Sequence, residues 1–131
     1  MTETEREAKI YFYGRPDGEY TAAFNGRVRY DGESVHIEYL ESETERVQLS
    51  ILDRIVTLSH IGELVYTLIL EKDTPASFAV ATKLGRFPLT IIPKTVETEL
   101  TDQNIRVSLA YEVGADDSMT DMRFEIRCEL L

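Results

Sequence analysis

The chain has few of the residues that build cross-links or membrane spans. It contains one cysteine in 131 residues, so it cannot form an internal disulfide, and we expect a reducing, cytoplasmic location. No apolar run is long enough to cross a bilayer, because the longest, residues 64–70, is interrupted by Tyr66 and Thr67. No basic start leads into an apolar segment, so we expect no signal peptide.

Basic residues are scarce relative to acidic ones. The chain has 14 Lys and Arg against 24 Asp and Glu, which gives a formal net charge of −10 at pH 7. This charge repels phosphate backbones and anionic membrane surfaces, and no basic stripe with interleaved aromatic residues offsets it. The sequence therefore predicts neither nucleic acid nor a membrane as a partner, and the acidity is best explained by solubility.

Motifs for catalysis or cofactor binding are also missing. The sequence has no Gly-rich phosphate loop, no serine elbow and no dinucleotide fingerprint. His36, His60 and Cys128 supply too few ligands for zinc, and the acidic stretches 41–45 and 116–121 match no calcium loop. We predict no metal, no cofactor and no catalytic residue. An enzyme that uses a carboxylate–histidine pair is a remote alternative.

What the sequence does contain is alternation of apolar and polar residues along most of its length. In residues 105–113 the apolar positions Ile105, Val107 and Leu109 alternate with Arg106 and Ser108, and residues 122–130 repeat the pattern. A period of two predicts strands with one dry and one wet face. Turn residues separate such segments regularly, without any helical period. The sequence predicts one all-β domain over residues 1–131, an antiparallel up-and-down barrel of roughly eight to ten strands, with residues 1–6 flexible.

Glycine and proline mark the expected bends and turns. Residues 15–18 (Arg-Pro-Asp-Gly) predict a turn, and Asp31-Gly32 predicts a tight hairpin. Gly26, inside the next strand, predicts a bulge or sharp bend where the sheet curls to close. Pro93 predicts an edge or the end of pairing, because it donates no ladder hydrogen bond. Residues 114–121 predict the longest polar connection.

Several segments together resemble a known family. They are Phe24-Asn25-Gly26 with residues 35–41 (VHIEYLE), residues 58–62 (LSHIG), residues 82–87 (TKLGRF) and residues 105–112. In this order and spacing they resemble the small bacterial YwiB-like β-barrel family, over about residues 8–130. The resemblance implies a lipocalin-like (calycin) antiparallel barrel, found mainly in Gram-positive bacteria, with no established biochemical function and no recognised catalytic residues.

The interior of such a barrel is the first candidate site. We predict that hydroxyl-bearing side chains line it, namely Tyr30, Tyr39, Tyr66, Tyr111, Thr57 and Thr82. Hydroxyls on an apolar wall would orient a small neutral apolar ligand. Barrels of this size are also commonly filled by their own side chains, and the phenylalanines on the inward phase favour a filled core.

The outer surface is the second candidate site. Residues 55–70 are apolar on both phases, and a strand that is apolar on both faces must be covered. We therefore predict an interface that includes Val56, Leu58, Val65 and Ile69, covered by the N-terminal segment or by a second copy in a homodimer. The two predictions lead to one expectation, a non-enzymatic protein that binds either a small molecule inside the barrel or a protein partner outside it.

Overall fold

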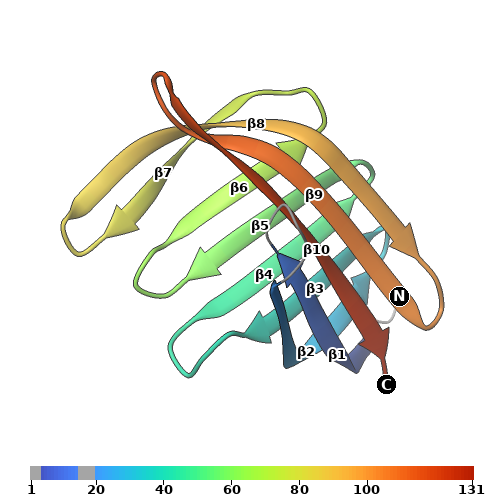
Figure 1. Cartoon of the computed structure of the whole chain (residues 1–131). Coiled ribbons are helices and arrows are strands. Elements are labelled where there is room, and N and C mark those ends of the chain that lie inside the picture. Colours follow the sequence, from blue (N-terminus) through green and yellow to red (C-terminus); the bar gives the residue numbers. More distant parts are fainter. Residues whose placement is uncertain (1–3, 15–19) are drawn as a thin grey trace.

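Antiparallel strands make up most of the chain in the computed structural model, which describes residues 4–14 and 20–131. The strands are β1 (Thr4–Gly14), β2 (Tyr20–Asp31), β3 (Ser34–Leu40), β4 (Arg46–Leu52), β5 (Ile55–Ile61), β6 (Tyr66–Glu71), β7 (Ala76–Thr82), β8 (Gly85–Leu100), β9 (Asn104–Ala115) and β10 (Ser118–Leu130). Their order in the sheet is β6-β5-β4-β3-β2-β1-β10-β9-β8-β7, and Figure 1 shows the sheet curled around a shared interior. The predicted all-β, antiparallel barrel is confirmed.

The barrel is nearly closed where β6 meets β7. Val65 and Ala81 exchange two backbone hydrogen bonds, of 3.0 and 2.9 Å, and form an isolated bridge. Further along, the amide of Asp73 donates to the carbonyl of Pro93 at 3.0 Å. No ladder joins β6 to β7 in the part of the chain that is described. We call this junction the seam.

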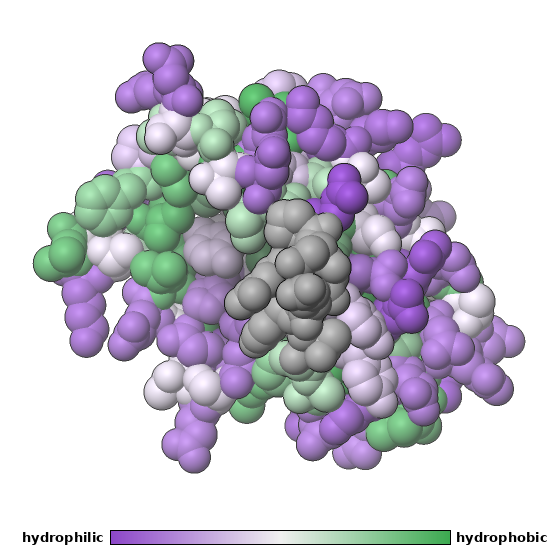
Figure 2. Space-filling view, in the orientation of Figure 1, coloured by the Kyte–Doolittle hydropathy of each residue, from purple (hydrophilic) through white to green (hydrophobic). Residues whose placement is uncertain are grey.

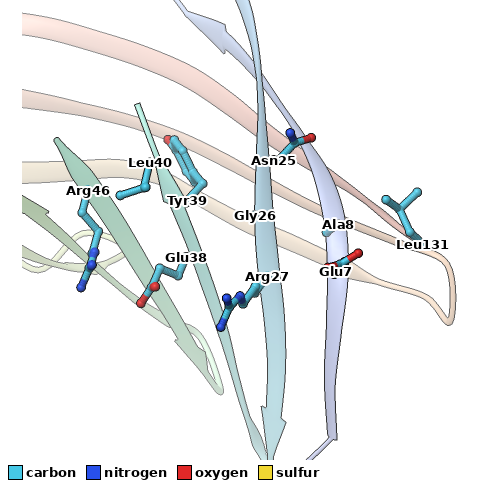
Figure 3. Close-up of a pocket in the computed structure, with 10 residues that line it drawn as sticks. All are labelled: Glu7, Ala8, Asn25, Gly26, Arg27, Glu38, Tyr39, Leu40, Arg46 and Leu131. Atoms are coloured by element: carbon cyan, nitrogen blue, oxygen red, sulfur yellow. The ribbon is translucent and has the colours of Figure 1, made fainter. Parts of the chain in front are cut away.

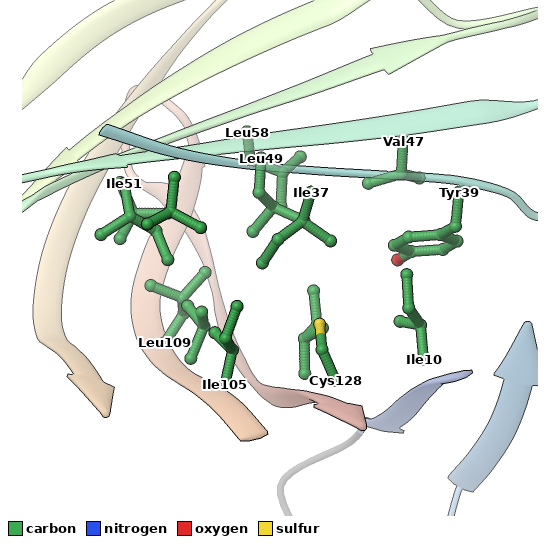
Figure 4. Close-up of a cluster of buried hydrophobic side chains, with 14 of the residues drawn as sticks. Ile10, Ile37, Tyr39, Val47, Leu49, Ile51, Leu58, Ile105, Leu109 and Cys128 are labelled. Atoms are coloured by element: carbon green, nitrogen blue, oxygen red, sulfur yellow. The ribbon is translucent and has the colours of Figure 1, made fainter. Parts of the chain in front are cut away.

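Alternation along the strands places one set of apolar side chains in the interior. Figure 4 shows side chains of β3, β4 and β5 facing those of β1, β9 and β10 across the barrel. Ile10, Ile105 and Ile126 have no exposed surface, and Ile37 and Leu49 are 1% exposed. Full burial of such a side chain contributes about 1.5–3 kcal/mol, so this core supplies most of the driving force for folding.

Gly26 lies within a regular ladder, whereas Pro93 lies where the ladder changes register. A Cβ atom at Gly26 would lie 2.3 Å from Cδ1 of Ile10 and 2.5 Å from the carbonyl oxygen of Glu38, so the neighbouring strands approach β2 closely here. Its pairing with β1 is regular on both sides of Gly26 and its pairing with β3 is regular from Gly26 onward, so the predicted bulge is absent. The register of β8 shifts between Pro93 and Thr95, just after its pairing with β7 ends.

Three local predictions need correction or comment. Residues 4–6 are not frayed, because they pair with residues 28–30 of β2. The side chain of Arg6 also donates to the carbonyl of Asp102 at 2.9 Å. Residues 114–121 are not one connection, since β9 and β10 extend until only residues 116–117 separate them. The predicted turn at residues 15–18 lies outside the described residues. No helix in the described ranges is long and apolar enough to span a membrane.

Candidate functional site

Aromatic rings gather at one end of the barrel interior. This is the end where β1, β3, β5, β7 and β9 finish, and we call it the aromatic end. It contains Phe12, Phe24, Tyr39, His60, Tyr66, Phe78, Tyr111 and Phe124. Their ring centroids lie 5.2 Å apart for Phe12–Phe124, 5.0 Å for the stacked pair Phe24–Tyr39, 6.1 Å for the edge-to-face pair Tyr111–Phe124 and 6.3 Å for Tyr66–Phe78. Such contacts hold the rings in defined orientations.

Three tyrosine hydroxyls at this end make no hydrogen bond to any described residue. Tyr39 and Tyr111 are 3% and 7% exposed, and Tyr66 is partly buried. Burial is the main cause that raises the pKa of all three phenols, and Tyr66 further raises the pKa of both Tyr39 and Tyr111. Among the described residues none donates to them or accepts from them, and Figure 4 shows the hydroxyl of Tyr39 directed into the barrel.

His60 joins two loops at the rim of the aromatic end. Its Nδ1 lies 2.6 Å from the carbonyl oxygen of Leu64, which only accepts, so Nδ1 carries a hydrogen and donates it. Its Nε2 lies 3.4 Å from a carboxylate oxygen of Glu41 and 3.4 Å from one of Glu45. The ring stacks on Tyr66 with the centroids 5.3 Å apart and the planes 6° from parallel.

Gly62 allows the carboxylate of Glu45 to reach His60. A Cβ atom at Gly62 would lie 1.6 Å from Oε2 of Glu45, so any side chain there would displace this carboxylate. Oε1 of Glu45 accepts a hydrogen bond from the amide of Glu63 at 3.3 Å, whereas Oε2 is buried and makes no hydrogen bond. The β3–β4 and β5–β6 loops are thus held together by two carboxylates around one imidazole.

The structure brings together some of the residues predicted to line the interior and separates others. Tyr39, Tyr66 and Tyr111 meet at the aromatic end. Tyr30 is half-buried at the opposite end of the barrel. Burial raises the pKa of its phenol, and the positive charge of Arg6 acts in the lowering direction. Thr57 lies between the buried Val56 and Leu58 and therefore points outward.

The hydroxyl of Thr82 is occupied by the β7–β8 turn. It donates to the carbonyl of Gly85 at 3.2 Å and accepts from the amide of Leu84 at 3.0 Å. The prediction that Thr57 lines the interior is wrong. Sequence reasoning also missed Glu41 and Glu45, because it treated residues 41–45 as a solvated connection. The local signal for this contact was Gly62, two residues after His60, because a residue without a side chain leaves room there for a neighbouring loop.

The predicted outer interface is also only partly present. Val56 and Leu58 are 0% and 6% exposed and belong to the core, so their assignment to an interface is wrong. Val65 and Ile69 do lie on the surface, 43% and 56% exposed. Three other exposed apolar residues at the rim were missed, namely Leu64, Leu84 and Phe87. We call these three residues and Val65 the apolar lip. Figure 2 shows apolar surface on this side of the molecule, over the β7–β8 hairpin and the start of β6.

The remaining chemically active side chains are held in structural roles. His36 lies between Ser34 and Ser50, with hydroxyl oxygens 3.1 and 2.9 Å from its ring nitrogens. Cys128 is 1% exposed, and burial raises the pKa of its thiol to about 12, so it is not a thiolate at neutral pH. No group of three His, Cys, Asp or Glu side chains in the described ranges is arranged to hold a metal ion.

One groove lies on the outer face of the barrel. Its volume is about 700 Å³, and it is bordered by strands β1 to β4 around Gly26. Figure 3 shows Arg27, Glu38 and Arg46 along this groove, extending from β2, β3 and β4. Charges of both signs alternate there, and Glu38 already accepts from Gln48 at 2.9 Å. The groove therefore offers no buried, unpartnered polar group to a ligand.

Comparison with known proteins agrees with this fold. The model of a family described as a domain of unknown function, DUF1934, matches residues 13–126. Among solved structures, the chain is similar to the crystal structure of ywiB protein from Bacillus subtilis, with 15% identity and a TM-score of 0.79 over 98% of this chain and 93% of that chain. At that identity the likeness shows the shared fold alone. No curated protein matches the chain.

Proposed function

The chain belongs to the DUF1934 family of domains of unknown function, and from this starting point we propose that it is a binding protein. Its ligand is a small amphipathic molecule with an apolar body and a hydrogen-bonding group. The aromatic end holds the ligand, with the apolar body against the rings and the polar group at Tyr39, Tyr66 and Tyr111. The single buried cysteine is consistent with a cytoplasmic location for this function.

One observation supports this proposal: two largely buried tyrosines have hydroxyls to which no described residue hydrogen-bonds. Tyr39 and Tyr111 are at least nine-tenths buried, and no described residue hydrogen-bonds to either hydroxyl. Neither hydroxyl oxygen is itself fully buried, because in the described ranges Oε2 of Glu45 is the buried side-chain atom without a partner, so both hydroxyls are accessible. A bound molecule that donates to or accepts from these hydroxyls would satisfy them.

The surroundings of His60 give it a structural role at the rim. Nδ1 of His60 donates to the carbonyl of Leu64, and Nε2 lies 3.4 Å from carboxylate oxygens of Glu41 and Glu45, so both ring nitrogens face groups of the protein. In this arrangement His60 fastens the rim, and the tyrosines remain the groups available to a ligand.

A titration with a defined neutral probe tests the proposal. We expect 4-phenylbutan-1-ol, which has an aromatic body and one hydroxyl, to bind the full chain in isothermal titration calorimetry. Removing both hydroxyls in Tyr39→Phe/Tyr111→Phe should weaken binding by about fivefold to 150-fold, because each of the two lost hydrogen bonds contributes about 0.5–1.5 kcal/mol. Tyr30→Phe, at the opposite end, is the matched control and should bind as the wild type does. The absence of binding by the wild type would refute the proposal.

The apolar lip favours a second candidate function, contact with a second copy of the chain. Leu84 is 91% exposed and Phe87 is 49% exposed, and both lie near Leu64 and Val65 at the rim. Contiguous apolar surface of this kind is typical of protein interfaces. In a symmetric dimer the same patch would cover itself.

A further inference from the structure

A histidine and two serines form a hydrogen-bonded chain on the outer face of the barrel. Ser34 and His36 lie two residues apart on β3 and therefore point to the same side, and the ladder places Ser50 of β4 directly opposite His36. Oγ of Ser34 lies 3.1 Å from Nε2 of His36, and Oγ of Ser50 lies 2.9 Å from Nδ1. All three residues are half-buried, so the sheet orders them while solvent still reaches them.

The β2–β3 hairpin determines which ring nitrogen carries the hydrogen. The hydroxyl of Ser34 lies 2.9 Å from the carbonyl oxygen of Asp31, which only accepts, so Ser34 donates its single hydrogen there. Ser34 can then only accept from His36, and this requires a hydrogen on Nε2. In the neutral ring Nδ1 therefore keeps its lone pair and accepts from Ser50. The hydroxyl hydrogen of Ser50 points at a base.

The hydrogen bonds that fix His36 in the sheet thus also activate Ser50. A hydroxyl becomes a nucleophile when a base within hydrogen-bond reach takes its proton and a third group orients that base. Here His36 is the base and Ser34 orients it. Another serine of this outer face has different surroundings, because the hydroxyl of Ser59 lies 3.1 Å from the hydroxyl of Thr67, which is not a base.

Ser50 and His36 border a pocket of about 390 Å³ on the outer face. Its charged side chains are two of each sign, Arg27, Arg29, Glu5 and Glu38. Arg27 and Glu5 lie 3.6 Å apart as an ion pair. The opposite charges balance, so the pocket favours an uncharged molecule. Its volume lies at the lower end of the range for ligand pockets and suits a short acyl chain.

We infer that Ser50 is a nucleophile for acyl transfer from small uncharged esters, with His36 as its base and Ser34 as a positioning residue. Oγ of Ser50 attacks the ester carbonyl carbon while its proton passes to Nδ1 of His36. The bond between that carbon and the alkoxy oxygen breaks, and the leaving group takes the proton and departs as an alcohol. Water then attacks the acyl-serine in the same way, which releases the carboxylic acid and restores Ser50.

This activity goes beyond the proposed binding function and does not depend on it. The pocket lies on the outer face between β1 and β4, whereas the proposed ligand site lies in the barrel interior. Failure of either one therefore leaves the other standing.

Nitrogen-15 NMR of the full chain tests the hydrogen-bond pattern without any substrate. Ring nitrogens with and without a hydrogen differ widely in chemical shift, and at mildly alkaline pH free imidazoles are neutral. We expect His36 to carry its hydrogen on Nε2, and His60, whose Nδ1 donates to Leu64, to carry one on Nδ1. In Ser34→Ala both tautomers of His36 should appear. A hydrogen on Nδ1 of His36 in the wild type would overturn the inference.

Acylation by 4-nitrophenyl acetate tests the chemistry. We expect the full chain to release nitrophenolate and to carry the acetyl group on Ser50, as located by peptide mass spectrometry. Ser50→Ala should abolish this label, and His36→Gln should slow its formation at least about 100-fold, the lower end of the contribution of a positioned base. Ser59→Ala removes a hydroxyl from the same outer face and should acylate as the wild type does.

The position of the acetyl group decides between specific and general reactivity. An acetyl group found on lysines and not on Ser50, or an unchanged rate in Ser50→Ala, would refute the inference. Circular dichroism establishes that each variant is folded. If His36→Gln does not fold, the label position in the wild type and the tautomer of His36 still decide the question.

Discussion

At the residue scale, two glycines lie where a side chain would collide with a neighbour, but the neighbours differ. At Gly26 the nearest atoms are Cδ1 of Ile10 in the core and the backbone carbonyl of Glu38. At Gly62 the nearest atom belongs to the flexible carboxylate of Glu45. A backbone atom in a sheet cannot move aside, whereas a partly exposed carboxylate can. The two positions therefore form a matched pair.

We predict that Gly26→Ala destabilises the barrel and that Gly62→Ala barely does. Overpacking typically costs about 1–3 kcal/mol, and the collision with backbone places Gly26→Ala toward the upper end. The measurement is the midpoint and slope of urea unfolding followed by circular dichroism. Equal unfolding free energies for the two variants would show that β2 can shift away from β3. The close packing described at Gly26 would then be wrong.

The buried phenols predict how stability changes at alkaline pH. The pKa of Tyr39 and Tyr111 is raised above the ordinary value of 10.0, mainly by burial. Above about pH 10 the unfolded chain releases these protons while the folded chain keeps them, so stability falls with rising pH. Below that pH the contribution is fully present.

Urea unfolding measured from neutral pH to about pH 11 tests this effect. Tyr39→Phe/Tyr111→Phe should lose less stability over that interval than the wild type, because the substituted side chains do not ionise. The chain has no tryptophan, so tyrosinate absorbance can be followed in the same samples. Parallel curves for the variant and the wild type would mean that the two phenols ionise freely in the folded state.

At the scale of the element, the seam is where the sheet is least constrained. Backbone groups alternate in direction along a strand, so Thr67 and Ile69 of β6 and Ser77 and Ala79 of β7 point into the seam. No backbone hydrogen bond joins these four described residues across it. Local opening should therefore need less free energy here than elsewhere in the barrel.

Amide hydrogen exchange measures this difference directly. We predict that the amides of Thr67, Ile69, Ser77 and Ala79 exchange at least about tenfold faster than amides hydrogen-bonded in the β1–β10 ladder. The amides of β1 and β10 provide the internal reference, since these two strands are far apart in the sequence and form a regular ladder. Uniform protection around the barrel would contradict an open seam.

The same scale shows which elements were predictable from the sequence. Residues 105–113 lie in β9 as predicted, because the buried Ile105, Val107 and Leu109 alternate with side chains that reach solvent. Residues 114–121 were not predictable as strands. Figure 1 shows that the β9–β10 hairpin extends past the rest of the rim, so its tip has no interior face and no apolar alternation.

The candidate site was predictable only where alternation defines the interior. The alternation of apolar and polar residues placed Tyr39, Tyr66 and Tyr111 in the barrel interior. On β5 it failed, because Ile55, Val56 and Leu58 make both faces apolar and the pattern does not distinguish inside from outside. The contacts of His60 depend on how two loops approach each other in space. No periodicity along the chain encodes that approach.

At the scale of the whole molecule, the apolar lip predicts an oligomeric state. If a second copy covers it, the wild type should sediment as a dimer, and Leu84→Asp/Phe87→Asp should sediment as a monomer. Leu84 is 91% exposed and Phe87 is 49% exposed, so the charged variant should still fold. Leu100→Asp, which changes a residue 48% exposed at the opposite end, is the control and should stay dimeric. A monomeric wild type would exclude this use of the lip.

Burial of Cys128 also determines how this protein can be labelled. Its thiol is 1% exposed and stays protonated at neutral pH, so maleimides and methanethiosulfonates should not modify it in the native state. A cysteine introduced at an exposed position such as Glu43 would then be the single reactive thiol, and the native one need not be replaced. A spin label or fluorophore can then be attached beside the rim, and a second introduced cysteine on the far side of the barrel would make a distance across it measurable.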